Sequence, residues 1–147
     1  MKKVPVTRFT LNARQALSIA QREAELERSS TIDIHHLLIG LAELPIGESA
    51  AAHVLNRLGI TADKLRRTPQ DDTNQVTQLN LSASVRQALE RAVTITRKRG
   101  EKDIASAHLL AGVLADETIP PLLTGTGAAV KRVNEALHSL DDWTDRR

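Results

Sequence analysis

Histidines are the residues best suited to chemistry in this chain, which has five of them and no cysteine. His35 and His36 are adjacent, and with His53 they could supply imidazole ligands to a metal ion. Adjacent residues on a helix point about 100° apart and cannot both aim at one ion, so we expect no metal site. His36 and His108 each precede a Leu-Leu pair. We predict that both are buried at helix starts and hydrogen-bonded to the backbone.

The motifs of several common catalytic machineries are missing from the sequence. It contains no Gly-x-x-x-x-Gly-Lys-Ser/Thr phosphate loop, no Gly-x-Ser-x-Gly elbow and no His-Glu-x-x-His zinc helix. Without cysteine there is also no thiol nucleophile and no disulfide framework. We therefore expect a protein that is not an enzyme and carries no cofactor.

The charge and aromatic content argue against most nucleic-acid binders and membrane proteins. The net charge is only +2, and the isoelectric point of 9.3 exaggerates it because no Tyr or Cys titrates between His and Lys. Phe, Trp and Tyr make up 1% of the chain, which removes the stacking platforms of single-strand binders. No apolar run could span a bilayer and no signal h-region opens the chain, so we expect a cytoplasmic protein without a membrane partner.

The sequence contains an internal repeat that places the two Leu-Leu-preceding histidines at equivalent positions. A shift of 72 places gives ten identities over residues 10–40, among them Ile32 with Ile104, His36 with His108 and Gly40 with Gly112. The register resumes after a gap of four, and a polar stretch lies between the copies. We expect one domain over 1–147, with repeat one at 8–67, a linker at 68–79, repeat two at 80–140 and a charged tail at 141–147. Trp143 lies in this charged tail, and we expect Trp143 to be disordered.

Each copy has apolar residues at helical spacing, and neither shows the alternation of a strand. Thr10, Ser82 and Asp33 are the predicted N-caps, and Gly59 is a predicted left-handed helix end. Further helices are expected at 49–58, 61–67 and 130–140, with a short irregular one at 119–123 because of its Pro-Pro pair. The predicted fold is all-α, with two pseudo-twofold-related four-helix repeats packed as one compact domain.

These residues resemble a known family. The blocks that carry the resemblance are Arg8-Phe9-Thr10, His36-Leu37-Leu38-Ile39-Gly40-Leu41 with its echo at 108–113, and the run 50–59. They are similar to the Clp N-terminal domain, the double-repeat module at the front of ClpA- and ClpC-type AAA+ unfoldases. The match runs from about Arg8 to Leu140 in both copies. It implies a protein-binding module that receives substrates and adaptors and performs no chemistry.

The resemblance also implies two pockets, where the first helix of each copy begins beside the start of the second helix. In the ClpC branch these pockets hold arginine-phosphorylated substrates, and an acidic residue pairs the guanidinium. His35 and Ala107 occupy the two acidic positions here, so we expect no phosphoarginine recognition. Thr10 with Arg14 and Ser82 with Arg86 still match the hydroxyl and base positions, which leaves weak capture of an anionic group at these helix starts open. The residues carried over as peptide- or partner-binding are Phe9, Thr10, Arg14, His35, Leu81, Ser82, Arg86 and Ala107.

Two function classes follow. The first is a free-standing, non-catalytic module that binds substrates, adaptors or Clp unfoldase and protease subunits, and so modulates ATP-dependent regulated proteolysis. The alternative to a free-standing protein is that the chain is the N-terminal piece of a full-length Clp unfoldase. The second is a small helical nucleic-acid-binding regulator that uses a basic region, namely Arg86, Arg91, Arg97, Lys98 and Lys102. The run 97–102 is also expected to close a helix, where cations complement the helix dipole.

Overall fold

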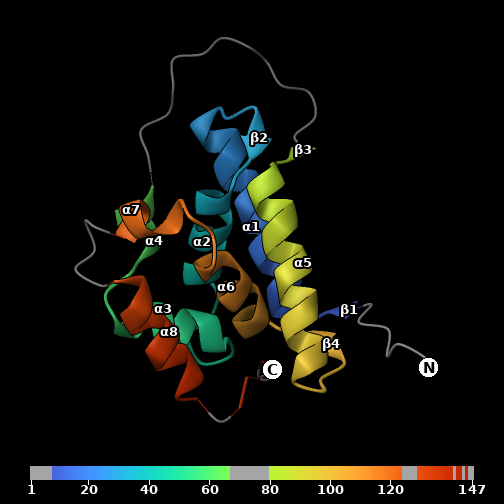
Figure 1. The fold of residues 1–147 in the computed structure, drawn as a ribbon. Coiled ribbons are helices and arrows are strands. Elements are labelled where there is room, and N and C mark those ends of the chain that lie inside the picture. The colour runs from blue at the N-terminus through green and yellow to red at the C-terminus, as the bar shows by residue number, and fades with distance from the viewer. Residues whose placement is uncertain (1–7, 67–79, 124–128, 141, 144, 146–147) are drawn as a thin grey trace.

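The structure is a computed structural model and describes residues 8–66, 80–123, 129–140, 142, 143 and 145. Within these ranges it has eight helices and four two-residue strands (Figure 1). The first half contains β1 (Arg8–Phe9), α1 (Leu11–Glu27), β2 (Thr31–Ile32), α2 (Ile34–Ala42), α3 (Ala50–Arg57) and α4 (Ala62–Leu65). The second half contains β3 (Asn80–Leu81), α5 (Ala83–Lys98), β4 (Asp103–Ile104), α6 (Ser106–Leu114), α7 (Ile119–Leu123) and α8 (Val130–His138).

The predicted all-α fold of two four-helix repeats is confirmed. α5 begins 72 residues after α1, from 11 to 83, and α6 begins 72 residues after α2, from 34 to 106. α8 begins 68 residues after α4, from 62 to 130, which is the same shift reduced by the predicted gap of four. The helix starts therefore follow the register of the repeat. The predicted linker at 68–79 lies outside the described residues.

The predicted helix caps are also confirmed. Thr10 and Ser82 accept from the backbone N–H groups of Ala13 and Val85, each at 3.2 Å. The Asp33 carboxylate accepts the N–H of the residue that begins α2 at 2.8 Å, and Gly59 has a φ of 80°. A capping oxygen satisfies a helix-start donor that the helix itself leaves unpaired.

Four short strands depart from the predicted pattern. β1 pairs in parallel with β4, and β2 pairs in parallel with β3. Each pair joins one repeat to the other, and Figure 1 places the two pairs at opposite ends of the antiparallel α1 and α5 helices. A strand of two residues is too short to produce a period of two, so the sequence pattern contains no sign of it.

The core is built on α2 and α6, whose residues are all buried. These helices are apolar on every side because the other helices surround them. Each packs closely on the first helix of its repeat through a glycine. A Cβ atom added to Gly40 would lie 2.3 Å from the carbonyl oxygen of Ala16, and one added to Gly112 would lie 2.4 Å from that of Ala88. Only glycine permits this approach of two helix backbones.

The expectation that Trp143 is disordered is wrong. The indole is 1% exposed, and its Nε1 donates to the carbonyl oxygen of Leu137 at 3.0 Å. The Arg99 guanidinium lies 4.0 Å from the ring centroid, and His108 contacts the ring edge to face. The large apolar area of the indole favours burial even though its neighbours in the sequence are charged. No helix in the described parts of the chain is long and apolar enough to cross a membrane.

Candidate functional site

Two equivalent sites form where a first helix and a second helix begin side by side, and each site combines the two repeats. We name them the α1–α6 site and the α5–α2 site. In the first, the N–H of Thr10 donates to the carbonyl oxygen of Ile104 at 3.0 Å. In the second, the N–H of Ser82 donates to the carbonyl oxygen of Ile32 at 3.0 Å. The two bonds are related by the shift of 72, so the helix starts that meet belong to different repeats.

Six of the eight expected binding residues lie at the surface or edge of these sites. Phe9 and Leu81 are partly buried and pack against the core from the two short sheets. Thr10 and Ser82 follow them as the N-caps of α1 and α5, one turn before two exposed arginines, Arg14 and Arg86. Within the described residues, neither arginine makes an ion pair. Each site therefore offers an apolar side chain, a hydroxyl and an unpaired cation.

The other two expected residues have no exposed surface to offer. His35 is 3% exposed, and its Nε2 lies 2.9 Å from a carboxylate oxygen of Glu27. Ala107 is fully buried. The positions that would carry an acidic side chain toward a guanidinium are thus part of the packed interior here.

His36 and His108 are buried and bonded to the backbone at helix starts, as predicted. Nδ1 of His36 accepts the N–H of Asp33 at 2.9 Å, and Nδ1 of His108 accepts that of Ala105 at 2.8 Å. An acceptor Nδ1 places the proton of a neutral ring on Nε2. His36 Nε2 then donates to Glu27 at 3.1 Å, and His108 Nε2 donates to Glu101 at 2.9 Å.

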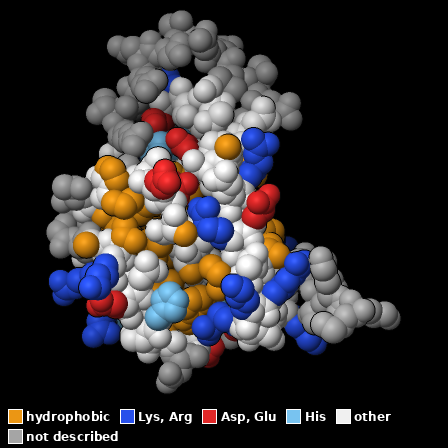
Figure 2. Space-filling view, in the orientation of Figure 1, with side chains coloured by type: hydrophobic (Ala, Val, Ile, Leu, Met, Phe, Trp, Pro, Cys, Tyr) orange, Lys and Arg blue, Asp and Glu red, His pale blue; other side chains and the backbone are white. Residues whose placement is uncertain are grey.

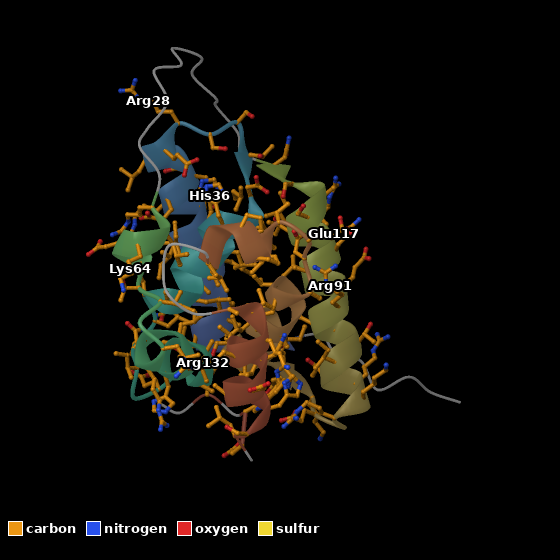
Figure 3. The ribbon with its side chains drawn as sticks, turned by 60° about the vertical axis from the view of Figure 1, so that its left-hand side comes forward. Arg28, His36, Lys64, Arg91, Glu117 and Arg132 are labelled. Carbon is orange, nitrogen blue, oxygen red and sulfur yellow. The ribbon has the colours of Figure 1, made fainter. Side chains whose placement is uncertain are left out.

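Burial sets the charge of these histidine clusters. Desolvation, reinforced by the neighbouring His35, lowers the pKa of His36 despite the opposing effect of Glu27. At Glu101, desolvation opposes ionisation, but hydrogen bonds from His108 and Arg99 outweigh it and lower the pKa of the carboxyl. Because its pKa is lowered, His36 is neutral at neutral pH. Figure 3 labels its position on α2.

The expectation that the adjacent His35 and His36 side chains point apart, which was the argument against a metal site, is wrong. The rings of His35 and His36 meet, with centroids 3.9 Å apart, and their ligand atoms lie with one of Glu27 within 4.8 Å of one another. The hydrogen bonds argue against a metal in another way. Because His36 Nδ1 already accepts a backbone N–H, Nε2 holds the proton and has no lone pair for an ion. The cluster is therefore a buried hydrogen-bond network.

The basic region of the second repeat is partly used within the fold. Arg91 Nε donates to the carbonyl oxygen of Gly112 at 2.9 Å, which ties α5 to α6 (Figure 3). Arg99, which follows α5, bonds to Glu101 and covers Trp143. The run 97–102 closes α5, as expected. Figure 2 shows patches of hydrophobic side chains on one face, with lysine and arginine side chains between them and around them.

Two acidic residues at the sites were not among the expected binding residues. Asp33 was predicted only as a helix cap, yet it also accepts from Ser82 Oγ at 3.1 Å across the α5–α2 site. Asp145, from the tail, accepts from Thr10 Oγ1 at 2.5 Å in the α1–α6 site. The alignment of Asp33 with Ala105 was the one available signal, because it left the helix that begins at Ser106, in the α1–α6 site, without a capping side chain of its own.

Comparison with known proteins gives the same fold and family. The N-terminal domain of the Arabidopsis thaliana chaperone ClpD superposes with a TM-score of 0.64 at 22% identity, covering 92% of this chain and 98% of that one. The Hsp104 N-terminal domain from Candida albicans superposes with a TM-score of 0.71 at 18% identity, covering 95% and 96%.

Curated relatives are much longer than this chain. ClpC/MecB of Bacillus subtilis, described as a negative regulator of genetic competence, is 25% identical over 138 residues, which are 91% of this chain and 16% of that protein. Chaperone protein ClpB 1 of Synechocystis is 28% identical over 125 residues, 81% of this chain and 14% of its own. The profile of the Clp repeat (R) N-terminal domain matches residues 8–119 and 80–142. Because that match includes both repeats, the chain belongs to the Clp repeat N-terminal domain family.

Proposed function

We propose that this chain is a non-catalytic docking module that binds substrates or adaptors of a Clp-type unfoldase, and thereby modulates ATP-dependent regulated proteolysis. The observation that carries the proposal is family membership over both repeats. The chain matches ClpC- and ClpB-type relatives over 16% and 14% of their own lengths, and the resemblance implies that this domain receives substrates and adaptors.

The two helix-start sites supply the chemistry for docking. Each has an apolar side chain beside a helix start, and each has an exposed arginine one turn further on. A partner segment that combines an apolar residue with an acidic one would contact both. Residues proposed to form the contacts are Phe9, Thr10 and Arg14 in one site and Leu81, Ser82 and Arg86 in the other, with Ala107 and His35 packed beneath them.

A reconstituted degradation assay tests this function. The chain is added to a purified ClpC-type unfoldase with its peptidase, an adaptor and an adaptor-dependent substrate. We expect degradation to slow when the concentration of the added chain approaches its Kd for the adaptor or substrate that it captures, since captured protein no longer reaches the unfoldase. Direct binding is measured in parallel with labelled adaptor and labelled substrate.

Charge reversal provides the matched variants. The double variant Arg14→Glu/Arg86→Glu should lose at least about tenfold in affinity, or about 1.4 kcal/mol, because both sites lose their unpaired cation. The control Arg132→Glu changes an exposed arginine on α8 that is away from both helix-start sites (Figure 3). Absence of binding to unfoldase, adaptor and substrate alike would refute the function. Equal affinity of the double variant and the control would refute the site.

A further inference from the structure

One carboxylate oxygen occupies the same position in both helix-start sites. In the α5–α2 site, Asp33 Oδ1 accepts from the N–H of Ile34, which begins α2, and from Ser82 Oγ. In the α1–α6 site, Asp145 Oδ2 accepts from the N–H of Ser106, which begins α6, at 3.0 Å and from Thr10 Oγ1. Ile34 corresponds to Ser106 and Ser82 to Thr10 under the shift of 72. The same two donors therefore hold the same oxygen in both sites.

The two oxygens come from different parts of the chain. Asp33 immediately precedes α2, so its carboxylate is carried by the N-cap residue itself and stays beside that helix start. Ala105 stands at the corresponding position before α6 and has no capping oxygen. Asp145, which lies 39 residues after Ser106, supplies the carboxylate at this helix start instead. In the α1–α6 site the carboxylate is consequently a separable occupant, and in the α5–α2 site it is a fixed part of the wall.

The donors around Asp145 are arranged for a carboxylate whether or not the tail supplies it. Ser106 is fully buried, and its Oγ donates to Asp145 Oδ1 at 2.5 Å while lying 2.8 Å from Ser49 Oγ. One oxygen of the group thus has two donors and the other has one. These donors stand at the starts of two helices, of 17 and 9 residues, where the helix dipoles favour negative charge. Without the carboxylate, the Ser106 N–H would be left unpaired.

The tail is held by its own anchor beside the site. Trp143 is buried two residues before Asp145, against Arg99 and the His108 ring at the start of α6. Loss of the Asp145 bonds alone therefore need not release the tail. Beside this segment lies a hollow of about 290 Å³, whose lining includes Ser49, the half-exposed Ile46 and Leu140. An incoming acidic segment would find an apolar contact next to the oxygen position.

We propose that the α1–α6 site is a carboxylate-binding site that Asp145 occupies as an internal ligand, and that it accepts an Asp or Glu side chain of a bound acidic segment when Asp145 withdraws. The inference rests on the proposed docking function and assigns a ligand class and a regulation to one of its two sites. Asp33 closes the α5–α2 site to the same ligand, because two carboxylates would compete for one set of donors. The two sites therefore differ in what they accept.

Titration of the Ser106 amide by NMR tests the proposal with sodium acetate as the probe. Ionic strength is held with chloride, and inorganic phosphate is titrated in a second arm. In Asp145→Ala we expect acetate to give saturable shifts at Ser106 with a millimolar Kd. In the natural chain the Asp145 carboxylate competes at an effective concentration in the millimolar range, comparable to that Kd, so the apparent Kd should be weaker by about twofold or more. Asp145→Asn, which keeps the size and loses the charge, should behave like Asp145→Ala.

Matched controls separate this site from general anion binding. Asp103→Ala removes an exposed carboxylate from β4 beside the site and should leave acetate binding as weak as in the natural chain. Trp143 fluorescence reports whether the tail is still packed in each variant. The proposal is refuted if acetate binds the natural chain and Asp145→Ala equally, if neither Asp145 variant shows saturation at Ser106, or if phosphate saturates the site and acetate does not. These outcomes leave the degradation assay untouched, so the docking function can stand when the carboxylate site fails.

Discussion

The close approach of helix backbones at Gly40 gives a quantitative prediction. In the variant Gly40→Ala, the new Cβ would lie 2.3 Å from the Ala16 carbonyl oxygen, whereas ordinary contact begins at 3.4 Å. The difference of 1.1 Å must come from separating α1 from α2, because the opposing atom is backbone and no side chain can rotate away. Overpacking of this kind costs about 1–3 kcal/mol, and the upper end applies to a rigid opponent.

A smaller gain opposes this cost. Replacing a helical glycine with alanine stabilises the helix by up to about 1 kcal/mol. The net loss in the free energy of unfolding should therefore be about 2 kcal/mol, and Tm should fall by about 4–8 °C. Gly112→Ala should behave alike, since its Cβ would lie 2.4 Å from the Ala88 carbonyl oxygen. Similar losses at both positions would follow from the equivalence of the repeats.

Urea unfolding followed by far-UV circular dichroism and by Trp143 fluorescence measures these losses, and coincidence of the two probes tests two-state behaviour. The control is Gly47→Ala, where an added Cβ would meet nothing within 4 Å and φ is not positive. It should change stability by less than about 0.5 kcal/mol. If Gly40→Ala is as stable as Gly47→Ala or more stable than the natural chain, the close packing of α1 on α2 is refuted.

Two further perturbations address the tail and the buried histidine. Trp143→Ala should lower the free energy of unfolding by about 3 kcal/mol, because a buried indole and its hydrogen bond to Leu137 are lost. Urea titrations followed by circular dichroism measure this loss, and Trp143→Phe should recover part of it. An unchanged urea midpoint for Trp143→Ala would contradict the burial of Trp143. Since the pKa of His36 is lowered on folding, the unfolded chain binds more protons near its ordinary pKa of about 6.5, and stability should fall as the pH drops below that value. His36→Gln keeps an acceptor for the Asp33 N–H but does not titrate, so urea midpoints between neutral and acidic pH should vary less with pH; an identical slope would show that His36 does not contribute.

Local signals in the sequence were enough to predict most of the helices. Thr10, Ser82 and Asp33 cap helices where their residue types and the following apolar spacing predicted. Capping depends on residues within one helical turn, so a single sequence contains the information. The register of 72 then extended each prediction from one repeat to the other.

The parts that could not be predicted depend on contacts between distant residues. Thr10 and Asp145 are separated by 135 positions, and nothing in the periodicity of either segment indicates that they meet. Trp143 was expected to be disordered because its neighbours in the sequence are charged, yet its indole is buried. Similarly, the angle between adjacent helical residues suggested that His35 and His36 diverge, although both long side chains turn toward Glu27.

The pairing of β1 with β4 and of β2 with β3 bears on how such a chain could have arisen. Each helix-start site takes one half from each repeat, so a single repeat on its own has neither site. Two separate copies associated as a symmetric homodimer would have had two identical sites. Fusion of the copies into one polypeptide allowed the sites to diverge, since a substitution in one half no longer appears in the other.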